Sequence, residues 1–203
     1  MNRNEQIRIA VERVSDVFRK KPSAALNTKR ASGTVEHGLV CHARQDGYTA
    51  TMDMPEPIGG EGSAPSPGFH IRVGLVGCIA IGIKLTAARE GLDIDRIDVE
   101  VEMDFDDAAM IGVSDNTAAP LEMRITISIE SAAPWKDVEA MVGRDIGEVL
   151  AAVVSLFNPS LIVVAGSSRR RARCCWPGSA SRSTAARCRW RPSTCASCRP
   201  RPA

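Results

Sequence analysis

The chain has 203 residues, of which 44% are hydrophobic and 25% charged, and its formal net charge is +2. This length and composition fit one globular domain with an ordinary core, and they exclude a chain that is disordered throughout. The N-terminal segment is charged and amphipathic, without the apolar run or cleavage site of a signal peptide. We therefore expect a cytoplasmic protein without disulfide staples.

The first part of the chain predicts one helix and one hairpin. Apolar side chains recur at helical spacing over Asn4–Lys20. Thr34–Ala43 and Tyr48–Met54 are predicted strands around Asp46-Gly47, because Asp-Gly is a strong hairpin signal. The proline- and glycine-rich residues 55–67 form a predicted loop that leads into the next helix, and such loops often border functional sites.

An apolar helix is predicted from Ser66, its N-cap, to about Gly91. Val73–Ile83 contains no charged residue, and this run is too short for a membrane span and too apolar for a surface helix. We therefore expect a buried central helix. Its interior glycines are Gly74, Gly77 and Gly82. Because each costs about 1 kcal/mol relative to alanine, we expect another backbone to pack closely there, with a helix of a second subunit as the natural candidate.

Two alternating strands and a second helix follow. Ile94–Phe105 and Met123–Glu130 alternate polar and apolar residues, so each predicted strand has one solvent-exposed face and one face packed on the core. The carboxylates on one face of the first strand are interpreted as a solvated face rather than a metal site: Asp98, Glu100, Glu102 and Asp104. A helix over Pro134–Phe157 and a short buried strand over Leu161–Ala165 complete an α+β layout.

The last residues, 167–203, have a different composition. They contain ten Arg and no Lys, Asp or Glu, which leaves 16 basic and 24 acidic side chains before them, a net charge of about −8. Five of the seven cysteines lie here: Cys174, Cys175, Cys188, Cys195 and Cys198. A basic nucleic-acid arm or a zinc site would use such residues, although the tail holds one CxxC pair and no His. We favour a shifted reading frame of a GC-rich gene, and expect disorder.

Residues from about 4 to 142 resemble the OsmC/Ohr superfamily. The resemblance rests on the proline-terminated loop Gly59–Pro67, the helix with Gly77-Cys78, and the stretch Ala87–Val99 that leads into the alternating strands. It implies an α+β, OsmC-like fold, in which antiparallel strands pack on a buried central helix. It also implies that two chains intertwine as a homodimer.

The same resemblance implies thiol-dependent reduction of organic hydroperoxides, with no cofactor and no metal. In that chemistry a thiolate attacks the O–O bond, becomes a sulfenic acid and condenses with a second cysteine. Cys78 matches the peroxidatic cysteine, and Arg44 is the positional candidate for the arginine that polarises the thiol. The chain departs from the family pattern in two ways. Gly68 stands where better-studied peroxidases have a glutamate, and the predicted helix 134–157 lacks the resolving cysteine.

The position of Cys78 in its helix restricts how its thiol could be activated. It lies about three turns past the helix start, beyond the one turn over which the helix dipole acts, and Arg72 points elsewhere around the helix. Activation must then come from another element or subunit. The alternative is a buried, inert thiol. Cys41, on the first predicted strand, fits a core or edge residue better than a resolving partner.

Residues 143–167 are similar to the C-terminal part of ROK-family sugar kinases and repressors, where a helix ending in Asn-Pro, here Asn158-Pro159, leads into a buried strand. The phosphate-binding turn and zinc set of that family are missing, so kinase activity is not expected. We infer a fused or misjoined coding sequence in four parts. They are an N-terminal helix and lead-in (1–30), an OsmC-like domain (31–142), a ROK-like helix–strand fragment (143–166) and a disordered Arg/Cys-rich tail (167–203).

Two functional hypotheses follow. The first is a thiol-dependent redox protein of the stress response that reduces organic hydroperoxides through Cys78 and uses an external thiol reductant. The second is a catalytically degenerate domain that binds a small ligand at the dimer interface. The expected partners are a second copy of the chain and a small molecule, and neither nucleic acid nor a membrane. Turnover of a hydroperoxide separates the two hypotheses.

Overall fold

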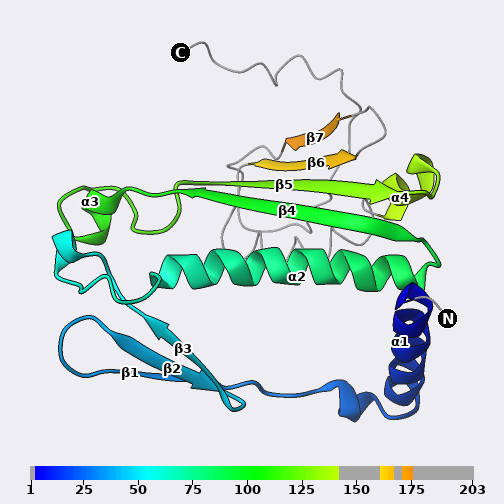
Figure 1. Ribbon diagram of the computed structural model, residues 1–203, viewed down its shortest axis with the longest axis horizontal. Helices are drawn as coiled ribbons and strands as arrows, with labels where there is room; N and C mark the ends of the chain where they lie inside the picture. Colours follow the sequence, from blue (N-terminus) through cyan, green and yellow to red (C-terminus); the bar gives the residue numbers. More distant parts are fainter. Residues whose placement is uncertain (1–2, 142–160, 167–170, 176–203) are drawn as a thin grey trace. The chain divides into compact units, whose positions relative to one another are not determined.

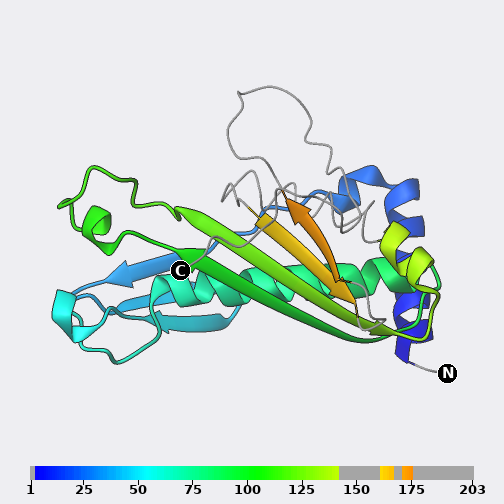
Figure 2. The same ribbon diagram turned by 90° about the horizontal axis from the view of Figure 1, so that it is seen from above.

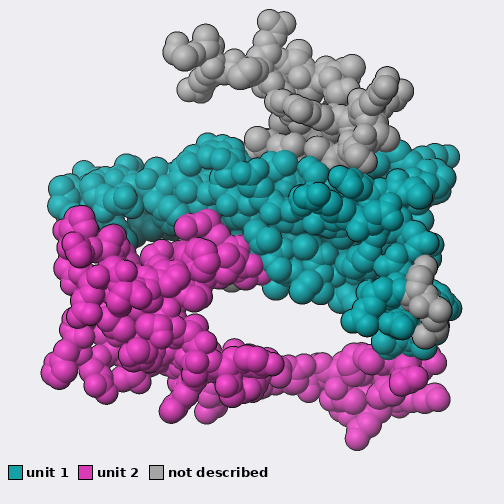
Figure 3. Space-filling model, in the orientation of Figure 1, with its two compact units in different colours: residues 1–11, 75–203 teal, residues 12–74 magenta. Residues whose placement is uncertain are grey.

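The computed structural model describes residues 3–141, 161–166 and 171–175 of the chain. The chain divides into two compact units, which Figure 3 colours separately. The first unit comprises residues 1–11 and 75–203, and the second comprises residues 12–74. Helices α1 (Arg3–Lys20) and α2 (Pro67–Arg89) each contribute residues to both units. Both predicted helices are therefore confirmed within a few residues.

The second unit contains a three-stranded antiparallel sheet in the order β1-β2-β3 (Figure 1). Its strands are β1 (Ser32–Val35), β2 (Cys41–Gln45) and β3 (Tyr48–Met52). Two short 3-10 helices flank them, η1 (Pro22–Ala25) and η2 (Glu56–Ile58). The turn between β2 and β3 is confirmed: Asp46 has a φ of 51° and Gly47 one of 83°, as a type I′ hairpin requires.

The predicted strand Thr34–Ala43 is wrong as a single element. It is two strands, β1 and β2, which pair with each other as a hairpin of their own. Gly38, with a φ of 73°, lies in the turn between them. A residue without a Cβ adopts this left-handed conformation at little cost, so Gly38 allows the chain to reverse where alternation alone predicted continuity.

The loop that precedes α2 is organised by one buried carboxylate. Asp53 is 1% exposed. Its Oδ1 accepts a hydrogen bond from the Met54 N–H at 2.7 Å, and its Oδ2 accepts from the N–H of Glu61 at 3.1 Å. The N–H and the hydroxyl of Ser63 both donate to Oδ2 at 2.9 Å. These bonds hold the pKa of the Asp53 carboxyl below its ordinary value, with the Ser63 N–H as the main cause.

The same loop tolerates only glycine at position 60. A Cβ on Gly60 would lie 1.8 Å from the carbonyl oxygen of Met54. The backbone of this segment therefore folds back on itself at contact distance, and Asp53 supplies the acceptors that its N–H groups would otherwise lack.

Helix α2 begins and ends with the expected caps. The Phe69 N–H lies 3.4 Å from Ser66 Oγ. At the other end Gly91 has a φ of 72°, and the Leu92 N–H donates to the Ala87 carbonyl at 2.9 Å. This is the Schellman arrangement, which satisfies carbonyls left free by the last turn.

Helix α2 extends well beyond the uncharged run Val73–Ile83, on which the expectation against a membrane span was based. The helix has 23 residues and an 18-residue window of mean hydropathy 1.8, so its length and composition alone would let it cross a membrane. The core helix of a soluble protein meets the same criteria. One row of its side chains, Leu75, Ile79 and Ile83, is buried in the hydrophobic core of the first unit.

The first unit is built on a four-stranded sheet in the order β4-β5-β6-β7 (Figure 2). The strands are β4 (Ile94–Asp104), β5 (Glu122–Ser131), β6 (Leu161–Gly166) and β7 (Arg171–Cys175). Short helices α3 (Asp107–Met110) and α4 (Trp135–Met141) lie before and after β5. β4 and β5 are antiparallel, as are β6 and β7, whereas β6 runs parallel to β5.

The core of this unit forms where α2 and α4 pack against alternate residues of β5. The inward side chains of β5 are at most 1% exposed: Met123, Ile125, Ile127 and Ile129. Ile94 of β4 and Val138 and Met141 of α4 belong to the same cluster. The alternation of β4 and β5 in the sequence thus predicted both strands and the face that each buries.

The C-terminal predictions are tested only in part. The predicted helix Pro134–Phe157 is described as α4 up to Met141, and its remainder, with most of the ROK-like fragment, lies outside the described residues. The predicted strand Leu161–Ala165 is observed as β6. β7 lies within residues 167–203, where we expected no structure, and the other residues of that segment lie outside the described ranges.

Candidate functional site

Cys78 carries a free, exposed thiol on helix α2 of the first unit. Residues one helical turn apart on one side of this helix enter the core, and Cys78 lies on the other side, with Ile81 and Leu85. Ile81 is 61% and Leu85 43% exposed. The predicted buried central helix is confirmed for one side of α2, whereas the side that carries Cys78 is exposed in the single chain, in contrast to the alternative of a buried thiol.

Two interior glycines of α2, Gly74 and Gly77, have no close neighbour within the described part of the chain. A Cβ built on Gly74 or on Gly77 would meet no atom within 4 Å. No contact with the described residues therefore requires glycine at these two positions. The prediction that a second subunit packs its backbone here remains a prediction, and the open apolar side around Cys78 is compatible with it.

No side chain among the described residues stabilises a thiolate at Cys78. The Cys78 sulfur makes no hydrogen bond to the residues that the structure describes. The start of α2 at Pro67 is three turns away, so the helix dipole does not reach the sulfur. An activating group would have to come from outside this set of residues, as the sequence indicated.

Arg44 and Cys78 belong to different units. Arg44 lies on β2, and its Nε donates to Ser32 Oγ at 3.3 Å. Its side chain is on the exposed face of the β1–β3 sheet, whereas Cys41 is on the half-buried face, paired with Val35 and Met52 in register. Cys41 is therefore half-buried on the central strand of this sheet and lies neither in the core nor on an edge strand, and Arg44 is on the polar side.

One of the two departures from the family pattern, Gly68, lies at the start of α2. A Cβ on Gly68 would lie 3.3 Å from Arg72 Nη1. Two residues on, His70 has a buried Nε2 that makes no hydrogen bond with the described residues. The His70 ring packs edge-on against Phe69, with 5.4 Å between the ring centroids. Position 68 therefore offers no carboxylate where the family pattern has a glutamate.

The four carboxylates of β4 form a solvated face, as predicted. Asp98, Glu100, Glu102 and Asp104 are all exposed. Arg124 on the neighbouring strand donates to Asp104 at 2.6 Å and to Glu102 at 3.2 Å, and Arg96 donates to Asp98 at 3.0 Å. The Arg124 hydrogen bond lowers the pKa of the Asp104 carboxyl, and Asp104 in turn raises the pKa of Arg124.

Two features of the second unit were missed by the sequence reasoning. Asp53 looked like the last polar residue of a strand, and the only signal for its role was its place directly before a loop rich in glycine and proline. His42 had no sequence signal beyond its place on a predicted strand, although it lies next to Arg44 on the same face of β2. Both become visible only when the strand register and the loop path are known.

Residues 60–144 match the family model described as OsmC-like protein, and this range contains Cys78. The match begins inside the Asp53-organised loop and ends just past α4. No curated protein matches the chain. The similarity of residues 143–167 to ROK proteins and the shifted reading frame remain predictions.

Solved structures with the same architecture come from several bacteria. A hypothetical protein from Aquifex aeolicus VF5 has a TM-score of 0.52 at 10% identity, over 70% of this chain and 96% of that one. An organic hydroperoxide resistance protein OsmC from Legionella pneumophila has a TM-score of 0.50 at 16% identity, with the same coverage. A third, from Elizabethkingia anophelis, is an organic hydroperoxide resistance protein with thiocyanate bound, at a TM-score of 0.50, 14% identity, and 70% and 94% coverage.

At these identities the structures show the fold and nothing further. They confirm the predicted α+β class, with antiparallel strands packed on a central helix. The chain has the OsmC-like fold, and the segment that carries Cys78 matches the OsmC family model.

Proposed function

We propose that the protein reduces organic hydroperoxides and that the thiol of Cys78 is the nucleophile. The observation that carries the proposal is an exposed, free thiol on an apolar helix side, within the segment that matches the OsmC family model. A thiol must reach its substrate to react, and Cys78 meets this condition where a core cysteine would not.

The reaction balances with an external dithiol as reductant. The Cys78 thiolate attacks the outer oxygen of the hydroperoxide, the O–O bond breaks, and the leaving alkoxide takes up a proton to become an alcohol. The sulfur is left as a sulfenic acid. One thiol of the dithiol displaces water from that sulfur, and its second thiol closes the reductant's own disulfide and releases the Cys78 thiol. This route needs no resolving cysteine in the protein.

The neighbours of Cys78 favour an organic substrate. Ile81 and Leu85 lie on the same side of α2 and expose apolar surface beside the sulfur. An alkyl or aryl group would bury part of that surface on binding, which hydrogen peroxide cannot do. We therefore expect a bulky organic hydroperoxide to be reduced faster than hydrogen peroxide.

The proposal includes a homodimer in which two copies cover part of each other's exposed α2 side and leave the Cys78 sulfur open to substrate. The apolar side around Ile81 and the open space at Gly77 support it, because both suit a closely packed second helix. A second copy would also supply the group that activates Cys78, and Arg44 remains the arginine that the family resemblance indicates for this role. We expect such a dimer to work in the cytoplasm.

The decisive test follows Cys78 in the full chain. Trypsin, which cuts after Lys and Arg, releases Cys78 alone in the peptide 73–84 and Cys41 alone in 31–44. We expect cumene hydroperoxide to block alkylation of the 73–84 peptide, dithiothreitol to restore it, and the full chain to consume the peroxide over many turnovers. Cys78→Ser should abolish turnover, and the matched variant Cys41→Ser should retain it.

Absence of turnover with a reactive Cys78 would favour the second hypothesis, a ligand-binding domain without catalysis. The missing glutamate at Gly68 is the observation in its favour. The dimer is tested separately by sedimentation velocity on Ile81→Glu. We expect this variant to be monomeric, and Val113→Glu, a change at a residue that is 76% exposed outside α2, to remain dimeric.

A further inference from the structure

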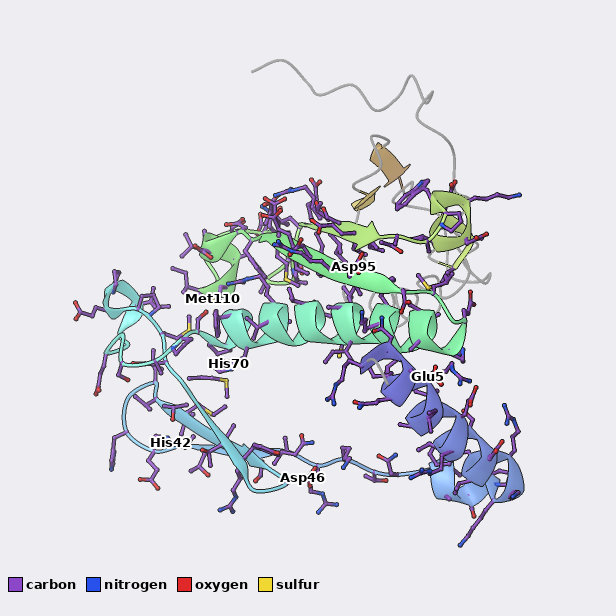
Figure 4. The ribbon with its side chains drawn as sticks, turned by 45° about the vertical axis from the view of Figure 1, so that its right-hand side comes forward. Glu5, His42, Asp46, His70, Asp95 and Met110 are labelled. Atoms are coloured by element: carbon purple, nitrogen blue, oxygen red, sulfur yellow. The ribbon has the colours of Figure 1, made fainter. Side chains whose placement is uncertain are left out.

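The exposed face of the β1–β3 sheet carries a regular pattern of polar side chains. The strand register aligns Ser32, Arg44 and Thr49 in one row across the three strands. It aligns Thr34, His42 and Thr51 in the next. Each row thus has a nitrogen-bearing side chain, Arg44 or His42, on the central strand with a hydroxyl on either side. We call these six residues the polar rows; Figure 4 labels His42 among them.

The polar rows line a groove within the second unit. Its volume is about 680 Å³, and all six residues border it. A second hollow of about 330 Å³ shares Ser32, Arg44 and Thr49 with it and extends to Arg30. A space of this size is in the range that small organic ligands occupy.

Hydrogen bonds within each row position the side chains of Arg44 and His42. Arg44 Nε donates to Ser32 Oγ at 3.3 Å, and His42 Nδ1 lies 3.3 Å from Thr51 Oγ1. The terminal nitrogens of Arg44 and the Nε2 of His42 have no partner among the described residues. Both side chains line the groove, so these nitrogens are available to bind a ligand there.

The charges around the groove favour an anion. The polar rows contain no carboxylate, and Glu36 is the acidic residue among those that line the larger groove. At the smaller hollow Asp46 is engaged by Lys29 Nζ at 3.3 Å. Arg44 has no acidic partner within the described part of the chain, in contrast to Arg124 and Arg96 of the first unit.

We propose that the polar rows bind a small phosphorylated molecule, with its phosphate at Arg44. A guanidinium presents parallel N–H donors that match two phosphate oxygens, and the adjacent hydroxyls can donate to a third. Arg44 and His42 are two residues apart on one strand, about 7 Å, too far for both to bind the same oxygen pair closely. The organic part of the molecule then lies along the His42 row. Arg44 is also the arginine that the family resemblance assigns to Cys78, and the two roles are separable: loss of phosphate binding in Arg44→Gln with hydroperoxide turnover retained would assign Arg44 to the polar rows alone.

The test measures phosphate binding to the full chain by isothermal titration calorimetry. The probes are glycerol 3-phosphate, inorganic phosphate and glycerol. We expect glycerol 3-phosphate to bind, phosphate to bind more weakly, and glycerol not to bind. Arg44→Gln should weaken binding of glycerol 3-phosphate by about 10- to 100-fold, the range for a lost charge-assisted hydrogen bond. His42→Gln should weaken it less, and should affect inorganic phosphate little.

Arg13→Gln is the matched control, because Arg13 is an exposed arginine on α1 without a described partner. It should leave binding unchanged. An equal loss in Arg13→Gln, or no binding of glycerol 3-phosphate by the wild type, would overturn the proposal. A single-stranded oligonucleotide that bound far more tightly through Arg44 would also overturn it, in favour of a nucleic-acid surface. All variants change exposed side chains, and thermal unfolding verifies that each is folded.

Discussion

The sheet of the first unit and the sheet of the second differ in what they bury. Among the described residues, all buried apolar side chains belong to the first unit, where β5 alternates between the core and a polar face. In the second unit the buried side chain is a carboxylate, Asp53, and the strand β1 is exposed throughout. The first sheet is held by hydrophobic burial, whereas the second is held by backbone pairing and by the contacts of one loop.

This contrast indicates how stable each unit would be by itself. A three-stranded sheet without a buried face is marginal in water, so the second unit needs a further surface to become stable. A partner chain is one such surface, which agrees with the dimer proposed above. The following experiments test this difference between the two sheets, in order of decreasing expected effect.

The largest effect is expected in the core of the first unit. Ile127 is completely buried at the centre of β5. Ile127→Ala should lower the free energy of unfolding by about 2–5 kcal/mol, since it removes buried methyl groups and leaves a cavity. The control is Val35→Ala in β1, where the side chain is 52% exposed and a change within about 0.5 kcal/mol is expected. Urea denaturation measures both, and equal losses would refute the contrast.

Gly60→Ala should have the next largest effect, and it should be local. The new Cβ would collide with the Met54 carbonyl, so the loop must move at a cost of about 1–3 kcal/mol. Hydrogen exchange over residues 53–66 should accelerate. Gly77→Ala is the matched control, because its Cβ meets nothing in the described chain, and the exchange of this loop should not change. An unperturbed loop in Gly60→Ala would show that the backbone is less tightly folded there.

A smaller, pH-dependent effect is expected at Asp53. Its pKa is lowered in the folded state, so its contribution to stability is present above the ordinary carboxyl pKa and is lost as the pH falls through the folded value. Asp53→Asn should therefore destabilise the protein near neutral pH and make little difference in acid. Unfolding curves of both proteins from pH 7 downward measure this convergence. A constant difference at every pH would mean that the charge of Asp53 is not what stabilises the loop.

Arg124→Gln should have the smallest effect. Arg124 pairs with Asp104 and Glu102 on a solvent-exposed face, where ion pairs contribute about 0.2–1 kcal/mol and are screened by salt. The loss should shrink at high ionic strength, as measured by thermal unfolding with and without added salt. A large, salt-independent loss would show that the polar face of the first sheet carries more stability than its exposure suggests.

Much of the fold followed from the sequence because the signals were local. The alternation around Ile127 predicted β5 and its buried face, and the caps at Ser66 and Gly91 predicted the limits of α2. The break between β1 and β2 was missed because Gly38 is a single glycine in a segment that otherwise alternates like one strand. A turn of this kind depends on which strands pair, which a short window does not contain.

The candidate site was predicted less completely than the fold. Cys78 was identified by its place in an apolar helix, but its exposure was not, because composition does not distinguish a side covered by the same chain from a side left open. Arg44 was chosen from its position along the chain. Its row with Ser32 and Thr49, and the neighbouring row of His42, depend on strand register, which the misplaced strand 34–43 concealed.

The fully exposed strand β1 has an evolutionary consequence. Substitutions at Ser32 or Thr34 alter no core packing and no buried hydrogen bond. Selection for folding alone therefore tolerates many side chains at these positions. Surfaces with that freedom can acquire new ligands while the scaffold persists. We expect descendants of this chain to diverge fastest in the polar rows and slowest along β5, so that ligand preference and architecture evolve at separate rates.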